Sequence, residues 1–234
     1  MARNADPRLN ALVAAAAPAF GLTSSSAAFM AAKEFSFRWQ TGGGRLSLWV
    51  SDYLEDAPDD ALEDFVNGAL GFICKKRKQY GPAYLDYTAS DAFVLAKRPV
   101  YLRRSRNLTR SDRGRTRCLY DAAQRLLDGG LIGPNDLDNA LLTWTVSPNF
   151  RKLGYCSPMM KVVAVSSVFD SERVPEFACD YVLYHECLHL RQGYRPFVTR
   201  HHDAAFRREE HLFPQWQEAD RILRNLPRNP SCLR

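Results

Sequence analysis

All five histidines of the chain lie between residues 185 and 211. Three of them follow one pattern, in which His185 and His189 enclose the run Glu-Cys-Leu and His202 comes thirteen residues after His189. Residues four apart share one face of a helix, so the imidazoles of His185 and His189 can reach the same metal ion. Glu186 would lie beside that ion and accept a proton from a bound water molecule. The spacing therefore predicts a catalytic site with one Zn²⁺ ion per chain.

The third protein ligand decides the kind of zinc site, because catalytic zinc usually takes three protein ligands and leaves a fourth position for water. One common arrangement needs a ligand six residues after His189, but Arg195 stands there and a guanidinium has no lone pair to offer. We expect His202 as the third ligand, because it opens a helical segment that can turn its imidazole back toward the motif. The alternatives by residue type are Glu209, His201 and His211.

The elements around the motif can be read from hydrophobic periodicity and from Pro and Gly. Two β-branched runs at 141–146 and 161–166 are typical of strands, and the stretch 148–158 between them fits a hairpin-type connection. Pro175 opens an expected helix that carries the motif and ends at about Gln192. Further expected elements are a strand over 45–50 and helices over 58–73, 118–127 and 203–226, the last interrupted at Pro214.

These elements predict an α+β fold, with a small, mostly antiparallel sheet and the motif helix packed on one face, as in zincins. Residues 1–34 are rich in Ala and Ser, and we expect a flexible or loosely docked extension there. Residues 35–234 are expected to form a single domain, with its metal-binding core at 141–226. The chain has no stretch of about 18 consecutive apolar residues, so we expect no membrane partner.

Six cysteines are scattered through the chain without a C-x-x-C pair. This usage suits a reducing compartment and argues against a structural zinc ribbon, so we expect a cytoplasmic protein. Cys187 lies inside the motif, but two residues along a helix from His185 its side chain faces another direction. We expect Cys187 and Cys156 to be packing residues.

Positive charge is concentrated at residues 97–117, which hold nine Lys or Arg residues and one acid, Asp112. Such a segment can neutralise phosphates, so DNA is a candidate partner. A solvated loop is the alternative, because no base-reading motif accompanies the cations. The candidate phosphate contacts are Arg103, Arg104, Arg106 and Arg110.

Residues 151–226 resemble the SprT-like zinc metallopeptidases. The likeness rests on the Gly-Tyr-Cys-Ser run at 154–157, the strand-like run at 162–165, the histidine motif, and a histidine four residues before Phe206. It implies His185, His189 and His202 as zinc ligands and Glu186 as general base. It also makes proteins attached to DNA candidate substrates. The chain departs from the family in lacking the cysteine-rich zinc ribbon that follows the catalytic region in some members.

The expected function is zinc-dependent hydrolysis of peptide bonds in a protein or peptide substrate. A zinc amide hydrolase of narrow specificity, and a nucleic-acid-binding protein with a structural or idle zinc site, are the alternatives. Asp180 and Asp203 are either partners of the ligand histidines or helix-surface carboxylates. Candidate donors to the developing oxyanion are Tyr155, Tyr184, Tyr194, His201 and His211.

Overall fold

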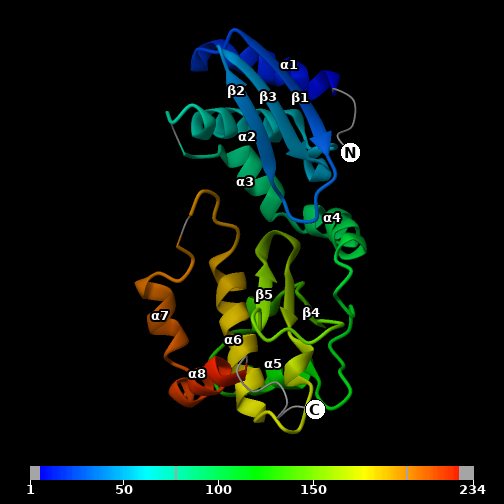
Figure 1. Cartoon of the computed structure of the whole chain (residues 1–234), viewed down its shortest axis with the longest axis vertical. Helices are drawn as coiled ribbons and strands as arrows, with labels where there is room; N and C mark the ends of the chain where they lie inside the picture. Colours follow the sequence, from blue (N-terminus) through cyan, green and yellow to red (C-terminus); the bar gives the residue numbers. More distant parts are fainter. Residues whose placement is uncertain (1–5, 77, 199, 227–234) are drawn as a thin grey trace. The chain divides into compact units, whose positions relative to one another are not determined.

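The chain divides into two compact units, residues 1–104 and residues 105–234 (Figure 1). The structure is a computed structural model that describes residues 6–76, 78–198 and 200–226. It confirms the α+β class. It differs from the sequence-based expectation of one domain preceded by an extension, because residues before position 35 are built into the first unit.

The first unit has β3 at the centre of its sheet, with β1 parallel to it on one side and β2 antiparallel to it on the other. In Figure 1 its helices α1 and α2 lie behind the strands. Its elements are α1 (Pro7–Ala16), β1 (Ser24–Met30), β2 (Phe37–Gly42), β3 (Arg45–Ser51), α2 (Asp59–Ile73), α3 (Pro82–Ala89) and α4 (Asp91–Arg104).

The described part of the expected extension, residues 6–34, is an integral part of this unit, whereas residues 1–5 lie outside the described residues. Leu9 and Val13 of α1 have no exposed surface, and Arg8 forms an ion pair of 2.6 Å with Asp59 at the start of α2. Strand β1 pairs with β3 along its whole length. Alanines hide such an element in the sequence, since they are only weakly apolar, but their small side chains let a helix and a strand pack closely.

Helix α4 overlaps the basic segment at residues 97–104 and is not among the helices expected from the sequence. Its buried residues are Phe93, Val94, Lys97 and Tyr101, which is helical spacing once Lys97 is counted as an inward-facing residue. The Lys97 ammonium is paired with Asp56, which explains how a lysine occupies that position. A charged residue on the buried face therefore concealed the helix.

The second unit carries the histidine motif. Strand β6 is central in its sheet, with β4 parallel to it and β5 antiparallel to it at the other edge. Its elements are α5 (Leu119–Asp128), β4 (Leu141–Trp144), β5 (Gly154–Ser157), β6 (Val162–Val165), α6 (Glu176–Gln192), α7 (Ala204–Glu210) and α8 (Trp216–Asn225).

Two expectations about this sheet were wrong. The stretch 148–158 is not a simple connection, because it contributes strand β5, and the runs on either side of it pair in parallel. Each sheet therefore has one parallel and one antiparallel pair, so neither is mostly antiparallel. Lys161 makes the turn from β5 into β6 with a positive φ of 48°. A Gly or Asn at this position would have indicated the turn in the sequence, but a lysine does not.

Helix α6 forms the core of the second unit and has the bounds that the sequence predicted. Pro175 precedes its first turn, and Gly193, with a φ of 68°, ends it. It packs between the sheet and helices α5 and α8, and ten of its residues are buried, among them Leu183 and Tyr184 with no exposed surface. Neither α6 nor any other helix in the described ranges is long and apolar enough to cross a membrane.

Candidate metal centre

Three of the five histidines converge at one point of the second unit. His185 and His189 lie one turn apart on α6, and His202 reaches them from the loop that precedes α7. The centroids of the three imidazole rings form a nearly equilateral triangle, with sides of 4.9, 4.9 and 4.8 Å. The structure thus brings together the three expected ligands.

The spacing of the nitrogen atoms fits a zinc ion. The candidate ligand atoms of the three histidines all lie within 4.8 Å of one another, and the Nε2 atoms of His189 and His202 are 2.9 Å apart. Zn–N bonds of about 2.0–2.1 Å in a tetrahedron place ligand nitrogens about 3.4 Å apart, so small side-chain rotations suffice. Three imidazoles are a usual donor set for catalytic zinc, and the residues present fit that ion.

Glu210 orients the first ligand. Its carboxylate accepts a hydrogen bond of 2.7 Å from Nδ1 of His185, which leaves Nε2 of that ring to face the other two histidines. Burial alone would raise the pKa of Glu210, but hydrogen bonds from His185 and Tyr181 outweigh it and hold the pKa below its usual range. A buried carboxylate of this kind fixes the tautomer and direction of a ligand imidazole.

Phe206 forms an apolar floor beneath the three rings. It is 2 % exposed, and its ring stacks on that of His189 at 4.6 Å and contacts the rings of His185 and His202. Burial and the neighbouring histidines lower the pKa of His189 to about 4, and burial also lowers that of His202. A lowered pKa favours the neutral imidazole, which is the form that binds a metal ion.

Glu186 lies beside the three histidines with only 5 % of its surface exposed. Burial raises its pKa to about 7, opposed by His185 and Lys152. None of the described residues donates a hydrogen bond to its carboxylate. Gly154 on β5 packs against it, and a Cβ at that position would come within 2.7 Å of Oε1. A glycine is therefore required for β5 to lie this close to α6.

The site opens into a cleft of about 540 Å³. One wall is strand β5 with Pro158, and the opposite wall is the segment from Gln192 to Phe197, with His201 and His202. Of the expected oxyanion donors, Tyr155, Tyr194 and His201 line this cleft. Strand β5 is an edge strand, since within the described residues it pairs with β6 alone.

None of the alternative third ligands joins the three converging rings. Glu209 binds Arg191 at 2.7 Å, and its backbone carbonyl accepts the Tyr184 hydroxyl, so Tyr184 is not an oxyanion donor either. His201 is exposed, with its ring 6.4 Å from that of His189. His211 stacks on Trp216 at 3.8 Å.

The other polar residues near the motif have structural roles. Asp180 forms a two-point pair with Arg125, and Asp203 caps α7 through the Phe206 N–H, so neither supports a ligand histidine. Cys187 is buried, and burial raises the pKa of its thiol to about 12. Cys156 lines the cleft, and burial raises the pKa of its thiol as well. Glu210 was not predicted, although it lies four residues after Phe206 on the same face of α7.

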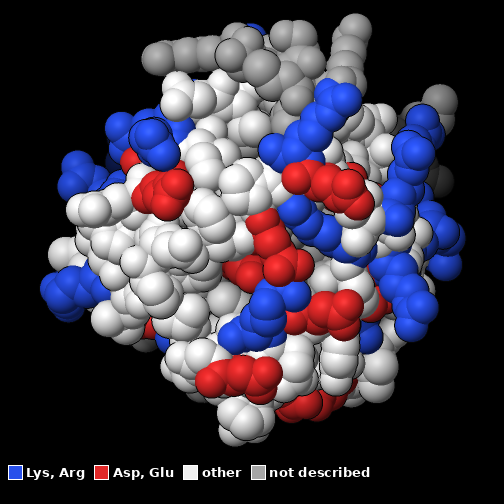
Figure 2. Space-filling model, turned by 90° about the horizontal axis from the view of Figure 1, so that it is seen from below, with Lys and Arg blue, Asp and Glu red and all other residues white. Residues whose placement is uncertain are grey.

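The candidate phosphate contacts are divided between the two units. Arg103 and Arg104 end α4 in the first unit, whereas Arg106 and Arg110 belong to the second. Arg104 is not a surface cation, because it forms a two-point pair of 2.6 and 2.7 Å with Asp52. Arg117 donates to the carbonyls of Phe169 and Val174. On the face of the molecule in Figure 2, acidic side chains lie among the basic ones near its centre.

No family model, no curated protein and no solved structure matches this chain.

Proposed function

We propose that this chain is a zinc-dependent metallopeptidase of the SprT-like kind. The observation that carries the proposal is the combination of three converging imidazoles with a buried carboxylate, Glu186, at the base of an open cleft. A zinc ion held by these imidazoles would supply Lewis acidity toward a carbonyl oxygen and toward water.

Glu186 is suited to proton transfer. A general base works best when its pKa lies near the operating pH, and burial brings the pKa of this carboxyl to about 7. It would accept a proton from the attacking water and return it to the departing amine. A purely structural zinc site has no use for such a group, since burying a carboxylate without hydrogen bonds is unfavourable.

Strand β5 is suited to hold the substrate. An extended peptide can add to an exposed strand edge through backbone hydrogen bonds, and β5 lies directly against Glu186 through Gly154. The peptide bond would then lie between this strand and the three histidines, as in the zincin-like arrangement. Tyr155, Tyr194 and His201 line the cleft walls, and their side chains are the candidates to stabilise the developing oxyanion.

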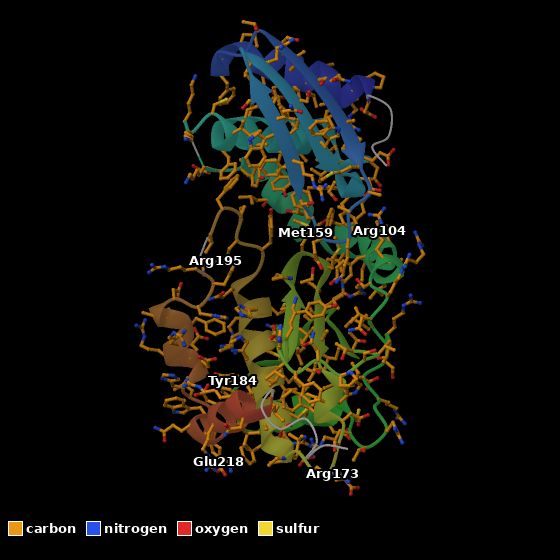
Figure 3. All side chains as sticks on the ribbon, in the orientation of Figure 1. Arg104, Met159, Arg173, Tyr184, Arg195 and Glu218 are labelled. Atoms are coloured by element: carbon orange, nitrogen blue, oxygen red, sulfur yellow. The ribbon has the colours of Figure 1, made fainter. Side chains whose placement is uncertain are left out.

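The test is peptide hydrolysis by zinc-loaded protein, comparing the natural chain with Glu186→Gln. Fragments of an unfolded protein substrate are separated by mass spectrometry. General-base catalysis contributes about 10²–10⁴-fold, so Glu186→Gln should lower the rate by that factor and keep its zinc. Glu218→Gln, the same change at an exposed position on α8, should match the natural chain (Figure 3). Equal rates for the natural chain and Glu186→Gln would overturn the proposal.

A further inference from the structure

Positive charge predominates around the rim of the cleft. Among its lining residues the only acid is Glu186, which lies at the base and is needed for proton transfer. The opposite walls each present a cation. Arg195 lines the wall that follows α6. Lys152, exposed just before β5, places its ammonium 4.4 Å from the ring centroid of Tyr155 on the other wall.

Arg195 has donor groups left for a ligand. Its described contact is with Asp203 at 3.5 Å, the outer limit of a hydrogen bond. The other oxygen of Asp203 is committed to the Phe206 N–H at 2.9 Å as the cap of α7. Figure 3 shows Arg195 on the loop that leaves α6. A carboxylate in the cleft could therefore take the guanidinium at little cost to the fold.

Arg191, which lies within α6 four residues before Arg195 in the chain, makes the contrast clear. Its guanidinium donates to Asp136, to Glu209 and to the Leu131 carbonyl. These bonds tie the end of α6 to its neighbours and leave Arg191 with a structural role. Among the residues that the structure describes, neither Lys152 nor Arg195 has such a set of carboxylate partners.

We propose that the cleft selects peptide segments that carry an Asp or Glu next to the bond to be cleaved. This inference rests on the proposed peptidase function and names its substrate class. A substrate carboxylate on either side would meet a cation, while a Lys or Arg would be repelled and would find no carboxylate on the cleft walls. Partly exposed charges give modest energies, so we expect about a tenfold preference in kcat/KM for Asp over Lys peptides.

The experiment uses peptides of one apolar sequence that differ only in an Asp, Ser or Lys on each side of the cleaved bond. The expected order of kcat/KM is Asp above Ser above Lys, with the ratio shrinking in high salt because the charges are screened. Lys152→Glu and Arg195→Glu should each reduce or invert the order. Arg173→Glu, which makes the same change of net charge far from the cleft lining, should leave it intact.

A measurement of peptide binding tests this inference separately from the proposed peptidase activity. Fluorescently labelled versions of the same peptides are titrated against zinc-loaded Glu186→Gln, in which no hydrolysis is needed for a signal. Tighter binding of the Asp peptide, lost in the Lys152→Glu background, supports the inference even where no peptide is cleaved. Equal binding of all three peptides, no binding of any, or a preference for Lys overturns it, whatever the natural chain hydrolyses.

Discussion

Residues 185–211 hold every histidine of the chain, and residues 97–117 hold nine of its 32 Lys and Arg residues. In the first segment, three imidazoles from a helix and the following loop converge on a single point. In the second, the cations are divided between two units. Lys97 and Arg104 make contacts inside the first unit, and Arg117 makes its contacts inside the second.

The difference lies in what each pattern specifies. The four-residue interval between His185 and His189 places both side chains on one face of a helix, and a metal site needs ligands that converge in this way. A count of positive charges carries no direction, and each cation is free to pair with the nearest carboxylate. Composition alone was therefore a weaker guide to the arrangement of side chains in the basic segment than spacing was in the histidine segment.

The largest effect is expected from comparing alanine variants of two adjacent histidines, His201 and His202. Replacing His202 by Ala removes one of three ligands and should weaken zinc affinity by more than about 100-fold, beyond the effect usual for outer partners. His201→Ala should leave the affinity within about threefold. Competition with a chelator measures both. Similar losses in the two variants would show that the site is not the one described.

Glu210 should have the next largest effect, because it fixes the direction of His185 through a 2.7 Å hydrogen bond. Glu210→Gln is expected to lower zinc affinity by about 10–100-fold. The adjacent Glu209→Gln serves as the control, since Glu209 binds Arg191. An unchanged affinity in Glu210→Gln would mean that the ligand histidines need no such support.

Arg104 tests whether a cation of the basic segment has a structural role. Its guanidinium donates to Asp52 and to the Ala32 carbonyl, and the Asp52 side chain is only 6 % exposed. Arg104→Met should lower the free energy of unfolding by about 2 kcal/mol, because a buried carboxylate loses its charged donor. The exposed Arg103→Met should change it by less than about 0.5 kcal/mol. Urea denaturation compares the two, and equal losses would contradict the structural role of Arg104.

The ion pair between Arg191 and Asp136 is expected to have a smaller effect on stability, and one that depends on pH. Burial would raise the pKa of Asp136, but hydrogen bonds from Arg191 and the Gly133 N–H hold it below its ordinary value of 3.8. The stabilisation is therefore complete above pH 3.8 and is lost as the pH falls through the lower value in the folded protein.

Asp136→Asn should accordingly lower stability by about 1 kcal/mol at neutral pH, with Arg191 partly screened by solvent. The difference from the natural chain should shrink at about pH 3. The exposed Asp138→Asn is the matched control. Thermal unfolding at the two pH values provides the measurement, and a difference that grows in acid would reverse the assigned sign.

Local signals predicted much of the second unit. Pro175 and Gly193 set the ends of α6, and the β-branched runs became β4 and β6. The convergence of His185, His189 and His202 was predictable because two share a helix face and the third follows at the start of the next helical segment. Strand β5 was missed, since four residues with a glycine carry little strand signal.

Features that depend on distant partners were not predictable from local pattern. The parallel pairing of β1 with β3 leaves no local mark, and α1 is concealed by its alanines. Lys97 faces inward because Asp56 reaches it from another part of the chain. Glu210 became visible as a partner of His185 only when α7 was placed beside α6.

The measurement that tests the central claim most directly is zinc K-edge X-ray absorption on the purified protein loaded with zinc. The account predicts one zinc ion per chain, bound by three imidazole nitrogens and one further light atom at about 2.0–2.1 Å. It predicts that one imidazole is lost from the spectrum in His202→Ala. A sulfur ligand at about 2.3 Å, or protein that retains no zinc, would contradict it.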